Sequence, residues 1–441
     1  MQAGGLNGNE KDAMAQRARL HRRIAGMLHK RLHEARFDEL EDPRDSRGQR
    51  WKLTALLHAA LVGLCAGCRS VADVEQLTDD MSAAMRSWLG IERRVPDTTL
   101  RELLCKLTPA ALRPHLHAVV RAAARRKALA VCALPFGVVS LDGKATALPS
   151  CDDFYAQRQS QSVTALVGVM RTITSVLVTH PARPCLDVLP IPASTNEMGG
   201  FETALRALWK VYGDSDLFRL VSYDAGACSL DNAALVRDLG LHYLFGLTGA
   251  QPTLHGEAKR LLAPLGAERA AAQSEDVARG ERTVRRLFLT EEMSGFGSWE
   301  HLRTVLRVES ETFDVAGRRV AYEERYFLSS LPLSRLSPAQ WLLLVRLHWG
   351  VETAHQILDV AFAEDDHPWI ESVPRAAVVV AILRRIAYDL LTLFRSVTQR
   401  ADRNRQRPWR SLMRQIYLAL VAATATQLAG IRRHLIPPVP D

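Results

Sequence analysis

The pattern of apolar and polar positions divides the N-terminal third of the chain into two parts. Residues 1–36 are polar and basic, and residues 37–130 place apolar side chains at helical spacing, most clearly over Leu53–Leu64. Pro96-Asp97-Thr98-Thr99 is a helix start signal, because Asp and Thr cap free amide groups. We therefore predict a basic arm over 1–36 and an all-helical domain over 37–130. Helical spacing alone does not show whether this domain binds DNA.

Runs rich in β-branched residues begin after residue 135. The first, Phe136–Leu141, ends at Asp142, and a later one, Leu217–Tyr223, ends at Asp224. The other elements expected here are strands at Ser162–Val169, Thr172–Thr179, Cys185–Ile191 and His242–Leu247, and helices at 197–212 and Asn232–Leu239. Strands followed by alternating helices and strands favour a mixed sheet covered by helices. We predict that 135–251 is the first part of this α/β core.

The pattern changes again after residue 251. Residues 252–332 begin with an Ala- and Leu-rich helical stretch and continue with strand-like runs broken by glycines, which predicts a largely β insertion. Residues 333–396 would complete the core, with one long helix from Ala339 to about Phe362. Residues 397–441 are expected to form a basic C-terminal tail.

Charge adds a preference for a polyanionic partner. The formal net charge is +9, from 57 Lys and Arg against 48 Asp and Glu. A basic balance favours nucleic acid, although a GC-rich genome would also enrich arginine. Lys11–Arg31 and Arg400–Arg414 are the densest basic stretches, and each suits either phosphate contact or a solvated surface.

The cysteines and the N-terminus indicate a reducing compartment. Seven scattered cysteines and a polar, charged N-terminus without a signal peptide predict free thiols and a cytoplasmic protein. Cys65 and Cys68 form an isolated CxxC in an apolar stretch, where core packing is favoured over a zinc or redox role. The apolar run Leu53–Ala66 is too short and too interrupted to cross a membrane.

Three acidic residues stand out by their positions. Asp142 and Asp224 each end a predicted strand, where ligand-binding side chains of open sheets gather, so the two carboxylates meet if the strands are neighbours. Glu352 lies within the predicted long helix, where helical geometry places it near His348. A charged residue beside apolar neighbours on this helix needs a partner.

Three converging carboxylates are suited to binding divalent metal ions. Mg²⁺ and Mn²⁺ prefer oxygen ligands, and a pair of such ions activates water and stabilises the leaving oxygen in phosphodiester cleavage. The alternatives are capping roles for Asp142 and Asp224 and a salt bridge for Glu352. The residues by themselves leave these interpretations open.

The motifs around these acids resemble those of DDE transposases of bacterial insertion sequences, in the branch with a β-rich insertion before the last Glu. The closest resemblance is to the H-repeat-associated sub-branch. The matching motifs, in order, are Asp42-Pro43-Arg44, Pro96-Asp97-Thr98-Thr99-Leu100-Arg101, Leu141-Asp142-Gly143-Lys144, Thr195-Asn196-Glu197, Ser222-Tyr223-Asp224-Ala225, Tyr243–Gln251, His348-Trp349-Gly350-Val351-Glu352 and Leu358–Asp365. Together they extend over about residues 37–395.

This resemblance implies a ribonuclease H-like fold with Asp142, Asp224 and Glu352 as catalytic, metal-binding residues. It further implies Mg²⁺, with Mn²⁺ as an alternative, and cut-and-paste transposition. The partners would be double-stranded DNA, as terminal inverted repeats and target DNA, and a second copy of the chain. The protein would then be cytoplasmic, associated with the bacterial nucleoid and not with a membrane.

The sequence departs from the family around the last acid. Val345 and His348 stand where Tyr and Arg are common, no Lys follows Glu352, and Thr248 and Ala250 replace Lys and Asn in the turn after a core strand. These changes affect expected contacts with DNA ends and leave the acids intact.

Three side chains near the acids are candidates for DNA contact: Lys144, His348 and Arg346. Lys144 is alternatively solvated, and His348 alternatively a neutral residue at the edge of the core. Asn196 and Glu197 fit the N-cap and first-turn acid of a helix better than a catalytic role. Two other functions remain open: a decayed or domesticated transposase that only binds DNA, and a metal-dependent nuclease of the same fold without strand transfer.

Overall fold

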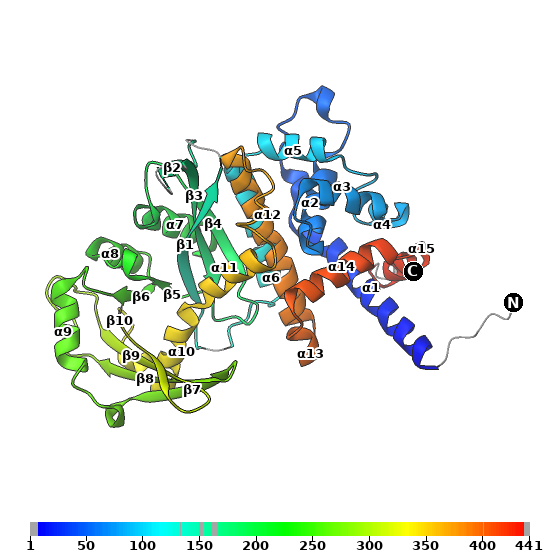
Figure 1. Cartoon of the computed structure of the whole chain (residues 1–441). Helices are drawn as coiled ribbons and strands as arrows, with labels where there is room; N and C mark the ends of the chain where they lie inside the picture. The colour runs from blue at the N-terminus through cyan, green and yellow to red at the C-terminus, as the bar shows by residue number, and fades with distance from the viewer. Residues whose placement is uncertain (1–7, 133, 150–152, 161–165, 400, 436–441) are drawn as a thin grey trace, which may run out of the picture. The chain divides into compact units, whose positions relative to one another are not determined.

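The computed structural model describes residues 8–132, 134–149, 153–160, 166–399 and 401–435 (Figure 1). The chain folds into two compact units, each assembled from separate stretches of sequence. The first contains residues 1–128, 145–170 and 355–441, and the second contains 129–144 and 171–354. The strands β1 (Val138–Leu148) and β3 (Leu166–Leu177) divide between the two units.

The first unit is mainly helical, as predicted for residues 37–130. Its helices are α1 (Gly8–Glu34), α2 (Leu53–Ala66), α3 (Val71–Asp80), α4 (Ala83–Trp88), α5 (Asp97–Lys106), α6 (Pro109–Arg125), α12 (Pro374–Leu393), α13 (Asp402–Arg405), α14 (Trp409–Ala422) and α15 (Ala425–Leu435). Helices α2, α5 and α6 pack against α12, which is buried along nearly its whole length. Side chains from distant parts of the sequence therefore build one helical core.

The expected basic arm and basic tail are both part of this core. Ile24, Leu28 and Leu32 of α1 are buried, and α1 packs against α14. The Arg23 guanidinium donates to Oε1 of Gln399 at 3.2 Å, which links α1 to the segment before α13. Arg17 and Arg19 on α1 are solvent-exposed. Residues 1–7, 400 and 436–441 lie outside the described residues.

His58 on α2 is a buried titratable group in this unit. Burial, with a smaller contribution from His33 and His29, lowers the pKa of His58 to about 4, against the effect of its hydrogen bond to the Leu89 carbonyl. Its Nδ1 lies 2.9 Å from that oxygen, so the neutral ring donates there. Because the unfolded chain takes up this proton nearer pH 6.5, protonation favours unfolding.

We predict that stability falls between pH 7 and pH 5. The contribution of His58 is full above about pH 6.5 and is lost as the pH falls toward 4, which amounts to about 2 kcal/mol at pH 5. His58→Asn keeps a donor for the Leu89 carbonyl and should flatten the pH dependence of the unfolding free energy by that amount. The exposed His301 provides the control, because His301→Asn should keep the wild-type slope. Equal slopes for His58→Asn and wild type would contradict the prediction.

The second unit is built on a mixed sheet. Its strands are β1, β3, β4 (Cys185–Ile191), β5 (Leu220–Tyr223), β6 (His242–Leu247), β7 (Ala272–Ala278), β8 (Glu281–Thr290), β9 (Thr304–Phe313) and β10 (Arg319–Ser329). The order is β3-β1-β5-β6-β10-β9-β8-β7, with β4 also paired to β3. The sheet is parallel from β1 through β6 and antiparallel from β6 to β7. This arrangement, flanked by helices, confirms the predicted mixed α/β architecture of ribonuclease H-like type.

The short strands at the centre are buried on both faces. Val138–Leu141 and all four residues of β5 are buried, which explains their continuous apolar runs. Helix α7 (Glu197–Tyr212) packs on the sheet through Phe201, whose ring lies edge-on to Tyr223 and Phe245. Helix α8 (Leu230–Asp238) follows β5. Of the strand expected at Ser162–Val169, residues 162–165 lie outside the described residues, and β2 (Ala156–Ser160) pairs with Leu166–Met170 of β3.

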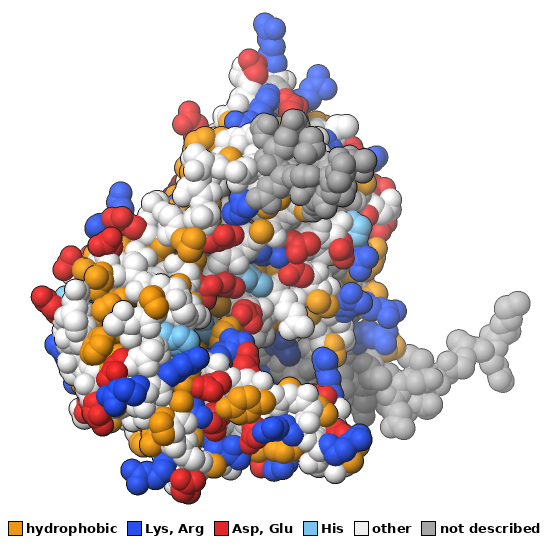
Figure 2. All heavy atoms as spheres, turned by 60° about the vertical axis from the view of Figure 1, so that its left-hand side comes forward, with side chains coloured by type: hydrophobic (Ala, Val, Ile, Leu, Met, Phe, Trp, Pro, Cys, Tyr) orange, Lys and Arg blue, Asp and Glu red, His pale blue; other side chains and the backbone are white. Residues whose placement is uncertain are grey.

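The predicted β insertion extends the core sheet and carries its own helix, α9 (Pro252–Leu262). Strand β10 pairs with β6, with Tyr326 opposite Leu247 and Ser329 opposite Leu244. Figure 2 turns this side of the unit forward and shows basic and acidic side chains interspersed. Cross-strand ion pairs account for this mixture, among them Arg285–Asp276 at 2.6 Å and Arg319–Glu311 at 2.9 Å.

The long helix predicted from Ala339 to Phe362 is two helices, α10 (Pro338–His348) and α11 (Gly350–Val360), interrupted at Trp349. A capping box of Ser337 and Gln340 starts α10. A Cβ atom on Gly350 would lie 2.9 Å from Cγ1 of Val178, so the chain passes too close to its neighbour there for a larger residue.

One bent pair of helices has the combined length and apolar composition of a membrane span among the residues that the structure describes. Within the described residues, no single helix has the length and apolar character to span a membrane. Leu53–Ala66 and Val71–Asp80 meet the criteria only when taken together across a bend of 95°.

Candidate active site

Asp142 and Asp224 are carried by neighbouring parallel strands. Val138 pairs with Leu220 and Ser140 with Ser222, so each aspartate lies two residues beyond one of the paired serines. The predicted adjacency of these strands is therefore confirmed. Asp224 directly follows β5, as expected, whereas β1 continues past Asp142 to Leu148, so the predicted strand end at Asp142 is wrong.

Negative charges concentrate around Asp224. Its side chain is open to solvent on one side and accepts a hydrogen bond from the Gly226 amide at 2.9 Å. Burial of the other side raises the pKa of Asp224, the Gly226 hydrogen bond lowers it, and the charges of Asp142 and Glu197 raise it further. The same three acids raise the pKa of the buried Tyr223, although burial is the largest cause. A cation placed here would relieve this repulsion.

A chain of hydrogen bonds lies beneath the two aspartates. The Ser140 and Ser222 hydroxyl oxygens are 2.6 Å apart across β1 and β5, and Nδ1 of His348 lies 3.1 Å from Ser222 Oγ. Burial lowers the pKa of His348 to about 4, against the opposing effect of Asp142, and Arg325 lowers it further. His348 is 3% exposed and neutral at pH 7, which agrees with the interpretation of a neutral residue at the core edge.

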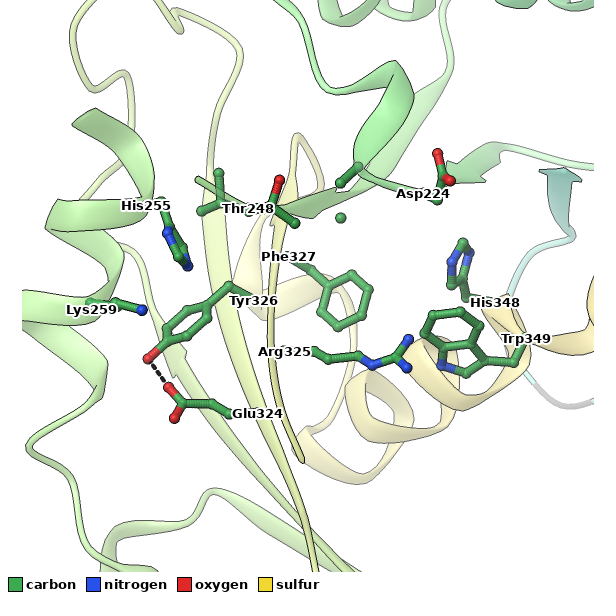
Figure 3. A pocket seen from close by; sticks show the side chains of 13 residues that line it. Asp224, Thr248, His255, Lys259, Glu324, Arg325, Tyr326, Phe327, His348 and Trp349 are labelled. Carbon is green, nitrogen blue, oxygen red and sulfur yellow. Dashed lines mark hydrogen bonds between the residues drawn. The ribbon is translucent and has the colours of Figure 1, made fainter. Parts of the chain in front are cut away.

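A cavity of about 500 Å³ opens beside Asp224 (Figure 3). Helix α9 contributes His255 and Lys259 to its wall, and β10 contributes residues 324–327. His348 and Trp349 from the end of α10 close the side next to Asp224. The cavity thus combines an acidic edge with basic and aromatic walls. Sequence reasoning missed the residues from α9 and β10, because no motif marks them.

Glu352 lies in a second cavity, of about 250 Å³, that shares Arg325, Phe327 and Trp349 with the first. The Arg325 guanidinium stacks on the Trp349 ring at 4.1 Å. Glu352 is exposed in the first turn of α11, so its predicted place in the middle of a helix is wrong. No three His, Cys, Asp or Glu side chains form a group that could hold a metal ion within the part of the chain that the structure describes.

The other two candidate DNA-binding residues differ in exposure. Lys144 is only 9% exposed, so most of its side chain is removed from solvent. Arg346 is exposed and its guanidinium lies 2.7 Å from Oδ2 of Asp276 on β7. Trp299 of the insertion is 6% exposed and belongs to the core.

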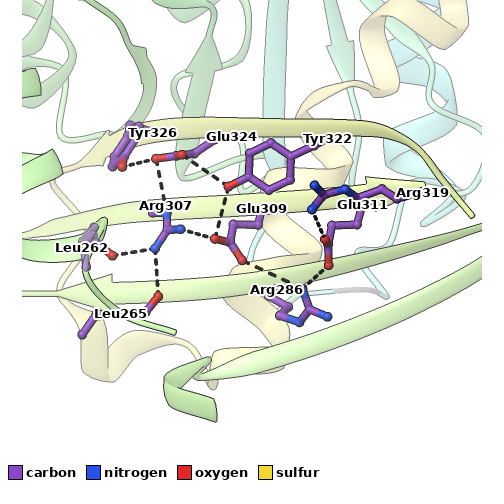
Figure 4. Close-up of polar contacts among 10 residues, drawn as sticks. All are labelled: Leu262, Leu265, Arg286, Arg307, Glu309, Glu311, Arg319, Tyr322, Glu324 and Tyr326. Atoms are coloured by element: carbon purple, nitrogen blue, oxygen red, sulfur yellow. Dashed lines mark hydrogen bonds and ion pairs between the residues drawn. The ribbon is translucent and has the colours of Figure 1, made fainter. Parts of the chain in front are cut away.

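Arg307 on β9 fixes the helix that carries two of the cavity residues (Figure 4). It donates to the carbonyl oxygens of Leu262 and Leu265 at 2.6 and 3.2 Å, at the C-terminal end of α9. It also pairs with Glu309 and Glu324 and is 4% exposed. Arg307 therefore holds α9, with His255 and Lys259, against the sheet.

Comparison with known families agrees with this geometry. Residues 171–389 match the family Transposase DDE domain, and residues 34–119 match the family DDE_Tnp_1-associated. The chain therefore belongs to the DDE-type transposases. Asp224 and Glu352 fall within the first match and Asp142 precedes it. A search among curated proteins gave no match.

Proposed function

We propose that the protein cleaves DNA at the ends of its own element and joins the freed ends to target DNA. The observation that carries this proposal is the position of Asp142 within β1 and of Asp224 directly after the neighbouring parallel strand β5, in a chain of the DDE-type transposases. The cavity at Asp224, with Lys259 and Arg325 in its wall, has the charge and the aromatic surface to receive a DNA strand.

A divalent cation, Mg²⁺ or Mn²⁺, fits the chemistry of this edge of the sheet. Carboxylate oxygens are the ligands that these ions prefer, and the raised pKa of Asp224 reflects negative charges that a cation would neutralise. Asp142 and Asp224 would hold the ion, and Glu352, in the adjoining cavity, would be the third acid. When bound, the ion supplies an activated water and stabilises the leaving oxygen of the phosphodiester.

The chain's own residues would position the DNA. The Gly226 amide fixes the Asp224 carboxylate, and the Ser140–Ser222–His348 hydrogen bonds keep the floor of the site rigid. Lys259 and Arg325 would bind phosphate groups in the large cavity. Lys144, Arg346 and His348 remain our proposed DNA-contacting residues near the acids.

The wider assembly follows from the same proposal. The helical segment 37–130 would bind the terminal inverted repeats, and two copies of the chain would pair the two ends of the element. The catalytic core would consist of 135–251 and 333–396, with 252–332 inserted. Because the substrate is chromosomal DNA, the protein would act in the bacterial nucleoid.

One experiment separates this function from the two alternatives. Purified protein is incubated with DNA that carries the terminal repeats of its element, with Mg²⁺ or Mn²⁺, and nicked and joined products are resolved. We expect metal-dependent nicking at the repeat ends, followed by joining. Binding without nicking would favour a decayed transposase, an outcome consistent with the separate cavity of Glu352. Nicking without joined ends would indicate a nuclease.

A further inference from the structure

We propose that the first unit contains a phosphate-binding site for the backbone of duplex DNA, made by none of the residues around the acids. The site is a cavity of about 250 Å³ whose wall carries Arg69, Arg410 and Arg414. The choice of ligand rests on the proposed function, which makes DNA the substrate. The inference assigns a role to part of the basic stretch Arg400–Arg414, which the sequence left open between phosphate contact and a solvated surface.

One face of α14 supplies two of the three arginines. Arg414 follows Arg410 by four residues and Tyr417 follows three residues later, a spacing that places all three side chains on the same side of a helix. Trp409 fixes the start of this helix, because its ring stacks on Tyr388 at a centroid distance of 5.7 Å. The two arginines therefore extend from the same helical face, about 6 Å apart along the axis.

The turn between α2 and α3 supplies the third arginine. Gly67 ends α2 in the left-handed conformation, and a Cβ atom built on it would lie 3.5 Å from Cβ of Met413 on α14. The turn thus lies directly against α14. Arg69, two residues after Gly67, consequently lines the same cavity as Arg410 and Arg414.

The fold leaves the positive charge of this cavity without a counter-charge. As far as the structure describes the chain, no acidic residue lines the cavity and none of the three guanidinium groups forms an ion pair. Arg410 makes one long contact, at 3.4 Å, to a backbone carbonyl. Two acids close by already accept other hydrogen bonds, Asp80 from the Tyr417 hydroxyl at 3.0 Å and Asp73 from the Arg69 amide at 2.7 Å. The guanidinium donors are therefore available to phosphate oxygens, which they bind in a planar fork.

The exposure of these arginines favours a DNA backbone over a small enclosed anion. Arg69, Arg410 and Arg414 are all exposed, so a single phosphate ion held here would remain in contact with solvent. Neighbouring phosphates of one backbone contact several of the charges together, and each contact releases counterions from the DNA. Because phosphates carry no base identity, we expect this site to bind DNA of any sequence.

Binding of a fluorescein-labelled DNA duplex of arbitrary sequence to the purified full-length protein, without divalent cations, tests the inference. Fluorescence anisotropy gives the association constant over a range of salt concentrations for wild type, Arg69→Gln and the double variant Arg410→Gln/Arg414→Gln. The control is Arg17→Gln/Arg19→Gln, which removes the same charge from exposed arginines of the other basic stretch.

We expect the Arg410→Gln/Arg414→Gln variant to bind at least about tenfold more weakly than wild type at about 0.1 M salt. Its logarithmic salt dependence should be less steep by about 2, because each phosphate contact contributes about 0.9 to the slope. Arg69→Gln, on a different element, should weaken binding roughly fivefold. The control should stay within about twofold of wild type, with an unchanged slope.

The outcomes separate this inference from the proposed function. If wild type binds the duplex and either the Arg410→Gln/Arg414→Gln variant or Arg69→Gln binds equally well, the inference is overturned and the proposed function stands. Equal losses in the two double variants would indicate attraction by the whole basic surface and would also overturn it. If wild type itself does not bind DNA at low salt, the proposed function fails together with the inference.

Discussion

Asp224→Asn is expected to lower the rate of DNA cleavage at least about 10³-fold, equivalent to roughly 4 kcal/mol of transition-state stabilisation. Asparagine keeps an oxygen for the Gly226 amide, which Asp224 binds at 2.9 Å, but it lacks the negative charge needed for the cation. The same substitution should leave the melting temperature equal or higher, since it removes a charge that burial, Asp142 and Glu197 all disfavour.

Cleavage rates and melting temperatures measured on the same preparations check this pair of effects. Asp231→Asn is a suitable control, because Asp231 is exposed in the first turn of α8, directly after the same loop. Near-normal cleavage by Asp224→Asn would contradict the proposed catalytic role. A large loss of stability would show that Asp224 serves the fold instead.

The second large effect concerns stability. Arg307→Met should lower the unfolding free energy by about 3–5 kcal/mol, the usual cost of removing one partner from a buried ion pair. Removal of the guanidinium deprives Glu309, which is 13% exposed, of its ion pair with Arg307. It also leaves the carbonyl oxygens of Leu262 and Leu265 without the Arg307 donor. Because those carbonyls end α9, the substitution should also loosen the wall of the Asp224 cavity.

Arg319 in the same network provides the comparison. Its side chain is 57% exposed and pairs with Glu311 at 2.9 Å, so Arg319→Met should cost less than about 1 kcal/mol. Chemical denaturation of the two variants and wild type measures the difference. Equal unfolding free energies of Arg307→Met and Arg319→Met would show that burial of Arg307 does not increase its contribution to stability.

The sequence predicted the parts of the site that depend on local pattern. Strands buried on both faces read as continuous apolar runs, so β1 and β5 were recognisable, together with Asp142 inside the first and Asp224 directly after the second. The register of β1 against β5 is a tertiary property that no run of residues reveals. Lys259 and Arg325 were missed because nothing in the sequence distinguishes them from other charged surface residues. The pairing of β10 with β6, which brings β10 to the core sheet, is a tertiary contact.

Tertiary contacts also explain where the helices differ from prediction. Apolar residues continue at helical spacing on both sides of Trp349, and the interruption occurs where Gly350 meets Val178 of another segment. The α1 segment was expected to be an arm because its arginines dominate, although Ile24, Leu28 and Leu32 already had the spacing of a buried helical stripe.

The pairing of β6 with β10 affects how the protein is made. During synthesis β6 emerges with one edge bare, because its partner residues, Tyr326 to Ser329, follow roughly 80 residues later. At ordinary rates of translation this wait is about 4–16 s. An apolar strand with an open edge is a template for pairing between chains. Expression that slows within the insertion should therefore favour aggregation of the nascent protein, whereas the finished sheet has this edge covered.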